Sequence, residues 1–166
     1  MIKAIILDFN GVILIKKGQS NYTKRIKILN LKENKLLQNI WWRNKYKEQD
    51  IDNHINNKLI NFIKGLKPKI KLGLITNAGL DMRKKLENLN LLKEFDCIVI
   101  SGEENLMKPD PKIYNIAIDR LKVNATEAIF IDDNILNVKG AKDIGMISIH
   151  ADGKINLIEK IKQNIS

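Results

Sequence analysis

The sequence predicts an α/β protein in which a parallel sheet lies between layers of helices. Short apolar runs recur along the chain, beginning with residues 4–7, and each stops abruptly at a polar residue or a turn. Stretches with apolar residues at helical spacing separate most of these runs. Buried parallel strands read as continuous apolar runs, so this alternation of strand and helix indicates a layered sheet.

Composition fits one domain with a small insertion, since the chain has 166 residues and 44% hydrophobic content. Its single cysteine, Cys97, excludes an internal disulfide. The apolar runs are too short to cross a membrane, and the run after Lys3 is too short for a secretion signal. We therefore expect a cytoplasmic protein.

The net charge of +10 comes mainly from lysines spread over the whole chain. A nucleic-acid-binding protein more often shows clustered arginines with interleaved aromatic residues. We interpret the charge as a solvated lysine surface that attracts anionic substrates such as phosphates, with a polyanion-binding face as the alternative. Specific nucleic-acid and membrane partners are not expected.

The first apolar run ends at Asp8, and Gly11 lets the backbone turn sharply soon after it. Ligands of open α/β sheets bind beyond the carboxyl ends of the strands, where Asp8 would lie. This residue is predicted to be a nucleophile or a metal ligand, the alternative being an aspartate that only caps the strand. Residues 12–15 are expected to form a short hairpin or flap that leaves the sheet.

Residues 17–67 are predicted to form a helical insertion after this first strand. One helix of the insertion would start at Asp52 and carry Ile55, Leu59, Ile60 and Ile63. Of the adjacent Trp41 and Trp42, one is expected in a core and one half-exposed, the alternative being a ring that roofs a pocket. His54 lies in a polar stretch and is expected at the surface.

The remaining strands alternate with helices and each ends at polar residues. The strands are expected at residues 70–75, 95–100, 128–131 and 146–149, and a last amphipathic helix at 155–165. Asp110 and Pro111 are typical of a helix start, which would hold Lys108 on a rigid loop just before that helix.

The strand ends and their loops bring together side chains that form a coherent chemical set. They supply Asp8, Thr76, Asn77, Lys108, Asp132 and Asp133, which would meet at one edge of a parallel sheet. Asp8 could attack an electrophile, Thr76 and nearby amides could hold an oxyanion, and Lys108 could balance charge. Two of the carboxylates, Asp8 and Asp133, could hold Mg²⁺.

Four segments in this order carry a resemblance that covers the whole chain: ILDFNGVIL, LITNAG, KPDPKIY and FIDDNILNVKGAKDIGM. They resemble the motifs of the haloacid dehalogenase superfamily, in the subclass I branch with a helical cap after the first strand. The resemblance implies a Rossmann-like core at 1–16 and 68–166 and a cap at 17–67. It also implies a Mg²⁺-dependent phosphatase that acts on a small phosphorylated metabolite through an aspartyl-phosphate.

Roles follow from the resemblance by position. Asp8 resembles the nucleophile, Thr76 the phosphate-binding hydroxyl with Asn77 beside it, and Lys108 the lysine that pairs with nucleophile and phosphate. The implied metal ligands are Asp8, the main-chain carbonyl of Asn10, Asp133 and its acidic neighbour Asp132. The implied catalytic set is Asp8, Asn10, Thr76 and Lys108, and the implied substrate-binding set is Thr76, Asn77 and Lys108.

Asn10 departs from the family pattern, which has a second aspartate that protonates the leaving group and later activates water. An amide cannot move a proton at neutral pH, and general acid–base catalysis contributes about 10²–10⁴-fold. Three hypotheses about the function remain. The chain is a weakened phosphatase for acyl or aryl phosphates, a catalytically reduced relative that binds a phosphorylated ligand or a protein partner, or a dehalogenase or phosphonate-type hydrolase. Asn10 also precedes Gly11, so it could deamidate to Asp, or it could be an introduced substitution.

Overall fold

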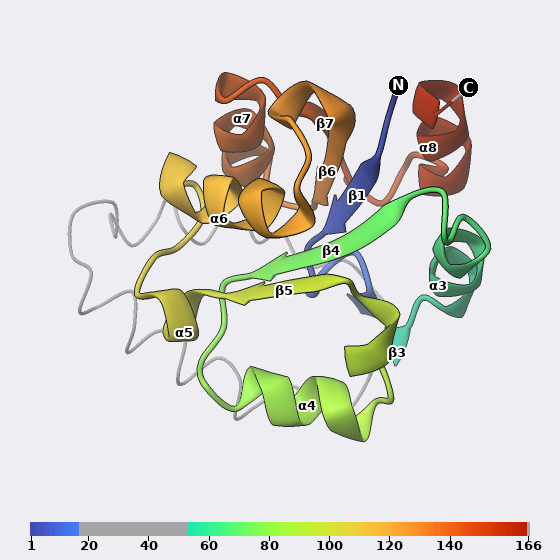
Figure 1. Cartoon of the computed structure of the whole chain (residues 1–166). Helices are drawn as coiled ribbons and strands as arrows, with labels where there is room; N and C mark the ends of the chain where they lie inside the picture. The colour runs from blue at the N-terminus through green and yellow to red at the C-terminus, as the bar shows by residue number, and fades with distance from the viewer. Residues whose placement is uncertain (17–52, 166) are drawn as a thin grey trace.

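The computed structural model describes residues 1–16 and 53–165, and its centre is a parallel sheet of five strands in the order β5-β4-β1-β6-β7 (Figure 1). The strands are β1 (Ala4–Leu7), β4 (Lys71–Thr76), β5 (Cys97–Ile100), β6 (Ala128–Asp132) and β7 (Ile147–His150). Every neighbouring pair is parallel, so the carboxyl ends of all five strands lie at one edge. The predicted layered, Rossmann-like α/β fold is confirmed.

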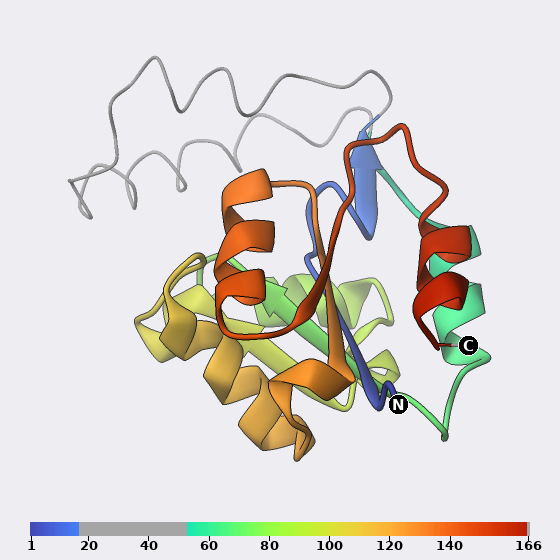
Figure 2. The same cartoon turned by 90° about the horizontal axis from the view of Figure 1, so that it is seen from above.

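Two hydrophobic cores cover the two faces of this sheet. Along β1, Ile5 and Leu7 face one core, and Ala4 and Ile6 face the other, as the alternation of side chains along a strand requires. The first face carries α3 (Asn57–Lys64), α4 (Met82–Asn88) and α8 (Leu157–Ile165), and the second carries α6 (Pro111–Leu121) and α7 (Ile135–Asp143) (Figures 1 and 2). Burial on both sides explains why the strands read as uninterrupted apolar runs.

Local sequence signals set the helix starts that flank the site. Asp110 caps α6 by accepting a hydrogen bond from the Lys112 N–H, and Pro111 occupies the first turn, as predicted. Asn134 caps α7 in the same way. Shorter helical segments are α5 (Ser101–Glu104), η2 (Leu92–Glu94) and η3 (Ala125–Glu127).

The chain after Gly11 leaves the sheet as expected, in an antiparallel ribbon of β2 (Leu14–Lys16) and β3 (Asn53–Ile55). The prediction that a helix starts at Asp52 is wrong, because Ile55 belongs to this ribbon. The helix starts instead after Asn56, whose side chain accepts a hydrogen bond from the Leu59 N–H at 3.2 Å. His54 is exposed on the ribbon, as expected.

Helix α3 packs into the core, although the sequence boundary at residue 67 assigned it to the insertion. Its buried side chains Leu59, Ile60 and Ile63 share a core cluster with Ile161 of α8. We therefore propose that the core domain comprises residues 1–16 and 53–165 of the described chain. Residues 17–52 of the predicted insertion, with the Trp41–Trp42 pair, lie outside the described residues.

None of the helices in the described parts of the chain is both long and apolar enough to cross a membrane.

Candidate active site

A buried lysine joins the ends of three neighbouring strands. The Lys108 Nζ donates hydrogen bonds to Asp8 Oδ1 at 2.7 Å, to Asp132 Oδ2 at 2.6 Å and to the main-chain oxygen of Ile75 at 2.9 Å. An ammonium group has three N–H donors, so these three contacts use all of them. With only 1% of its side chain exposed, Lys108 is a fixed internal charge that orients Asp8.

The Asp132 carboxylate is fully buried and is held on both oxygens. Its Oδ1 accepts a hydrogen bond from the Asn134 N–H at 2.8 Å, and its Oδ2 accepts from Lys108 and from Asn137 Nδ2, the latter at 3.0 Å. With both oxygens held, Asp132 fixes the position of the Lys108 ammonium group. Sequence reasoning missed Asn137 as a site residue. The signal that could have found it is its place in the first turn of α7, the helix that follows the Asp132-Asp133 pair.

The third carboxylate, Asp133, is half-buried and lies against the turn that follows β1. A Cβ atom at Gly11 would lie 2.3 Å from Asp133 Oδ2, and Gly11 has a φ of +84°. Both facts require glycine there, because the left-handed region strains other residues. The main-chain oxygen of Asp133 lies 3.1 Å from His150 Nε2, a contact in which Nε2 must carry the proton. His150 was not predicted.

These carboxylates form a cluster suited to a hard cation. One oxygen each from Asp8, Asp132 and Asp133 lies within 4.8 Å of the others. Lys108 contributes one positive charge against these three carboxylates. Carboxylate oxygens in this number are typical of Mg²⁺ or Ca²⁺ ligands.

The protonation of the cluster follows from burial and from its own charges. Burial is the main reason that the pKa of Asp8 rises to about 8; Lys108 opposes the rise, and Asp132 and Asp133 add to it. Burial alone would lower the pKa of Lys108, but Asp132 and Asp8 raise it above its ordinary value. The lysine therefore stays charged, while Asp8 holds a proton near neutral pH until another cation arrives.

Thr76, at the end of β4, has a hydroxyl that is ready for a ligand. The residue is fully buried, and its Oγ1 has no hydrogen-bond partner among the described residues. Buried hydroxyls are nearly always paired, so this one, at a strand end, is a candidate donor to an oxygen of a ligand. Next to it, Ser101 Oγ accepts from the Ala78 N–H at 2.9 Å and donates to Ala78 O at 3.1 Å, which fixes the loop.

The other two predicted residues also lie at this edge of the sheet. Asn77 follows Thr76, and its side chain contacts the backbone of Lys108. Asn10 is half-buried in the tight turn after Asp8, where Gly11 N–H donates to Leu14 O at 2.8 Å. Contacts thus join Asp8, Asn77, Lys108 and Asp132 directly, Asp133 belongs to the carboxylate cluster, and Thr76 and Asn10 are neighbours of this set in the chain.

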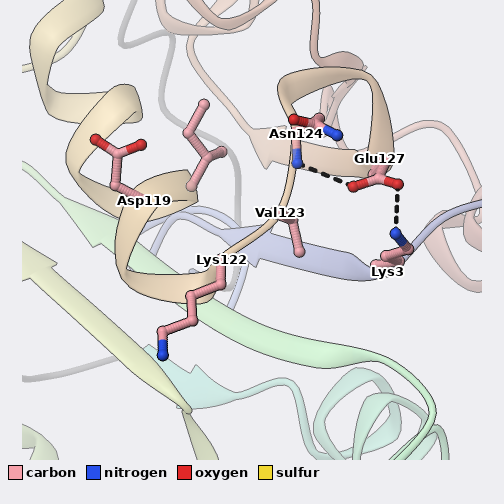
Figure 3. Close-up of a pocket in the computed structure, with 7 residues that line it drawn as sticks. Lys3, Asp119, Lys122, Val123, Asn124 and Glu127 are labelled. Carbon is pink, nitrogen blue, oxygen red and sulfur yellow. Dashed lines mark hydrogen bonds and ion pairs between the residues drawn. The ribbon is translucent and has the colours of Figure 1, made fainter.

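A shallow hollow lies at the opposite end of the sheet from these residues and has no such chemistry (Figure 3). Its volume is about 330 Å³, and it lies open to solvent beside the starts of β1 and β6. Lys3 Nζ pairs with Glu127 Oε1 at 2.6 Å, and the Asn124 N–H donates to Glu127 Oε2 at 3.0 Å. Lys3, Asn124 and Glu127 thus stabilise one another, and we assign the hollow no function.

The fold and the site define an α/β protein with a parallel sheet and a buried aspartate–lysine cluster at the carboxyl ends of its strands. The family of haloacid dehalogenase-like hydrolases matches residues 14–151. The chain therefore belongs to this family.

Two relatives and one solved structure illustrate the similarity. The chain is 32% identical over 95 residues to bifunctional epoxide hydrolase 2 of Mus musculus, which covers 54% of this chain and 17% of that protein. It is 34% identical over 85 residues to phosphoserine phosphatase of Thermus thermophilus, covering 50% of this chain and 34% of that one. The chain thus spans about a third or less of these relatives.

The solved structure is a HAD family enzyme of Bacteroides thetaiotaomicron in complex with magnesium and inorganic phosphate. It has a TM-score of 0.65 and 19% identity, and the match covers 90% of this chain and 94% of that one. At this identity the similarity shows the fold.

Proposed function

We propose that the chain is a Mg²⁺-dependent phosphatase that acts on a small phosphorylated metabolite through an aspartyl-phosphate at Asp8. The observation that carries this proposal is the 2.7 Å contact of Asp8 with the buried Lys108, together with the Thr76 hydroxyl, which has no hydrogen-bond partner in the described part of the chain. A phosphatase of Thermus thermophilus among the relatives agrees with it. We propose no nucleic-acid or membrane partner, and a cytoplasmic location stays an expectation.

The donor set fits Mg²⁺, which prefers a few carboxylates together with water and phosphate oxygens. Asp8, Asp133 and the main-chain carbonyl of Asn10 would hold the ion, and the Bacteroides thetaiotaomicron structure with magnesium and phosphate agrees with this choice. Asp132 was predicted as a ligand too, but we propose that it acts through Lys108, because both its oxygens accept hydrogen bonds. When bound, the ion supplies positive charge that offsets the phosphate and favours ionised Asp8.

The residues of this chain divide the reaction into two steps. A carboxylate oxygen of Asp8 attacks phosphorus, and the bond to the leaving group breaks, with the electron pair staying on the leaving oxygen. The Thr76 hydroxyl holds a phosphoryl oxygen, and Lys108 fixes the other oxygen of the attacking carboxylate. Water then attacks phosphorus, and the bond between phosphorus and the Asp8 oxygen breaks with its electron pair staying on Asp8. The protons of the water leave on dihydrogen phosphate, and the Asp8 carboxylate is restored.

Asn10 determines which leaving groups suit this site. Its amide cannot donate a proton, so the leaving oxygen must depart without help from that position. Acyl and aryl phosphates need less protonation than alkyl phosphates do. We propose these phosphates as the substrates that the chain hydrolyses best.

The test is Mg²⁺-dependent hydrolysis of acetyl phosphate and an aryl phosphate by the chain, by Asp8→Asn and by Asn10→Asp. We expect activity on both substrates, its loss in Asp8→Asn, and a gain on alkyl phosphates of about 10²-fold or more in Asn10→Asp. Activity that survives in Asp8→Asn would overturn the proposal.

A second candidate rests on Asn10 alone: a relative that binds a phosphorylated ligand or a protein partner without turnover. Under this alternative the chain stays silent on every phosphate while Asn10→Asp becomes active. Calorimetry with inorganic phosphate and Mg²⁺ would then detect binding to the silent chain.

A further inference from the structure

We propose that Asn77 is a positioning residue whose side chain fixes the backbone of Lys108 and thereby the place of the Lys108 ammonium. The sequence indicates a phosphate ligand at this position, because Asn77 directly follows Thr76 at the end of β4. The geometry points to a different task for its side chain. For its kinetic consequences, this inference rests on the phosphatase function proposed above.

Both ends of the Asn77 amide contact one residue that is 31 positions away in the chain. Its Nδ2 donates to the main-chain oxygen of Lys108 at 3.0 Å, and its Oδ1 accepts from the Lys108 N–H at 2.9 Å. This pair of bonds imitates the exchange between two paired strands. The contact connects the backbone of Lys108, which belongs to a loop and not to a strand, to the end of β4.

The contact matters because Lys108 works at the end of a long side chain. Its Nζ must reach Asp8, Asp132 and the Ile75 carbonyl together, at 2.6–2.9 Å. A shift of its backbone would move the ammonium away from at least one carboxylate. Misplacing a catalytic group by about 1 Å costs on the order of 10²-fold in rate.

The first test compares the phosphorylation of Asp8 by acetyl phosphate in the chain and in Asn77→Ala. We expect the maximum rate to fall by roughly 10- to 100-fold, with the half-saturating concentration changed by less than about threefold. A phosphate-binding side chain would give the opposite split, a higher half-saturating concentration at an unchanged maximum rate. That result would overturn the proposal.

Asn124→Ala is the matched control for general damage. Asn124 is also a loop asparagine next to a held backbone, in the capping box of η3 at the opposite end of the sheet, where its own N–H donates to Glu127 Oε2 (Figure 3). We expect this variant to lose stability without a change in either kinetic constant. An equal fall in maximum rate in both variants would mean that Asn77 has only a structural role, against the proposal.

A double variant tests whether Asn77 acts through Lys108. If it does, Asn77→Ala adds almost nothing to the loss already caused by Lys108→Met, because the ammonium that it positions is gone. If the two residues acted independently, the rate of the double variant would fall by the product of the losses in Asn77→Ala and Lys108→Met. That result would overturn the proposal.

Amide hydrogen exchange gives a readout that needs no turnover. We expect the Lys108 N–H to be protected in the chain and to exchange faster in Asn77→Ala, while core amides of β1 stay protected. A Lys108 amide that stays protected in Asn77→Ala would refute the positioning role. A chain that is never phosphorylated, yet shows the expected exchange, would support the positioning role and overturn the phosphatase function instead.

Discussion

Gly11 leaves open the space that the Asp133 carboxylate fills, since a Cβ atom on residue 11 would lie 2.3 Å from Asp133 Oδ2. The turn after β1 and the loop after β6 therefore fit together only with glycine at residue 11. This fit brings Asp133 to the carboxylate cluster with Asp8.

Gly11→Ala is expected to displace Asp133 and to weaken Mg²⁺ binding at least tenfold, together with a loss of about 1–3 kcal/mol of stability. Calorimetric titration with Mg²⁺ and urea unfolding measure the two effects. Gly145→Ala is the matched control: Gly145 has a φ of +92°, but its added Cβ would meet atoms no closer than 3.9 Å. It should lose stability and keep its Mg²⁺ affinity. Equal losses of affinity in both variants would contradict the role of the Asp133 contact.

Lys108→Met is expected to destabilise the chain by about 3–5 kcal/mol, because it leaves the buried Asp132 carboxylate without its cation and removes the hydrogen bond to Asp8. Lys64→Met provides the comparison. Its Nζ lies 2.7 Å from Glu94 Oε1, the same distance as in the Lys108–Asp8 pair, but the Lys64 side chain is 44% exposed. We expect a change of less than about 1 kcal/mol there. Urea unfolding at pH 7 measures the loss of stability in both variants. Similar losses would show that burial does not determine how much each lysine contact contributes.

The raised pKa of Asp8 predicts how metal-free stability depends on pH. The folded chain holds the Asp8 proton up to about pH 8, whereas an unfolded aspartate releases it near 3.8. The stabilising contribution is fully present below pH 3.8 and is lost as pH rises through about 8, with a slope of at most about 1.4 kcal/mol per pH unit. The check is the free energy of unfolding of the chain minus that of Asp8→Asn, measured without metal from pH 4 to 9. A difference in unfolding free energy that does not change with pH would contradict the raised pKa of Asp8.

Mg²⁺ should oppose the loss of stability with rising pH, because the ion binds ionised Asp8 and must displace its proton. We expect Mg²⁺ affinity to rise with pH up to about 8 and proton release on binding at pH 7. Calorimetry in two buffers of different ionisation heat counts the protons. Binding without proton release at pH 7 would show that Asp8 is already ionised.

Much of the site could be predicted because each key residue lies where a buried strand stops. Asp8 and Asp132 end uninterrupted apolar runs, and a carboxylate there indicates a bound charge or a partner, with a strand cap as the alternative. Asp110 and Pro111 likewise fixed the start of α6 and the loop that holds Lys108. These signals are local, so the sequence alone contains them.

The errors and omissions arose from contacts between distant segments. Asp52 and Asn56 are both good helix caps, and the pairing of Asn53–Ile55 with Leu14–Lys16 is what selects Asn56. The contact of Asn77 with Lys108 spans 31 residues, and no motif records it. The same holds for α3, whose apolar stripe predicts a helix but does not say which core it joins.

Asn10 is expected to keep its amide in the folded chain, although an asparagine before glycine is prone to deamidation. The reaction requires the backbone nitrogen of Gly11 to attack the Asn10 side-chain carbon, which expels ammonia. In the fold that N–H donates to Leu14 O at 2.8 Å, and the Gly11 φ of +84° belongs to the tight turn. Breaking one such bond costs about 0.5–1.5 kcal/mol, so conversion should be roughly two- to tenfold slower than in the urea-unfolded chain. Peptide mass spectrometry of both samples over time measures this. Equal rates would mean that the turn gives no protection, and activity of an aged preparation could then come from the deamidated fraction instead of the encoded amide.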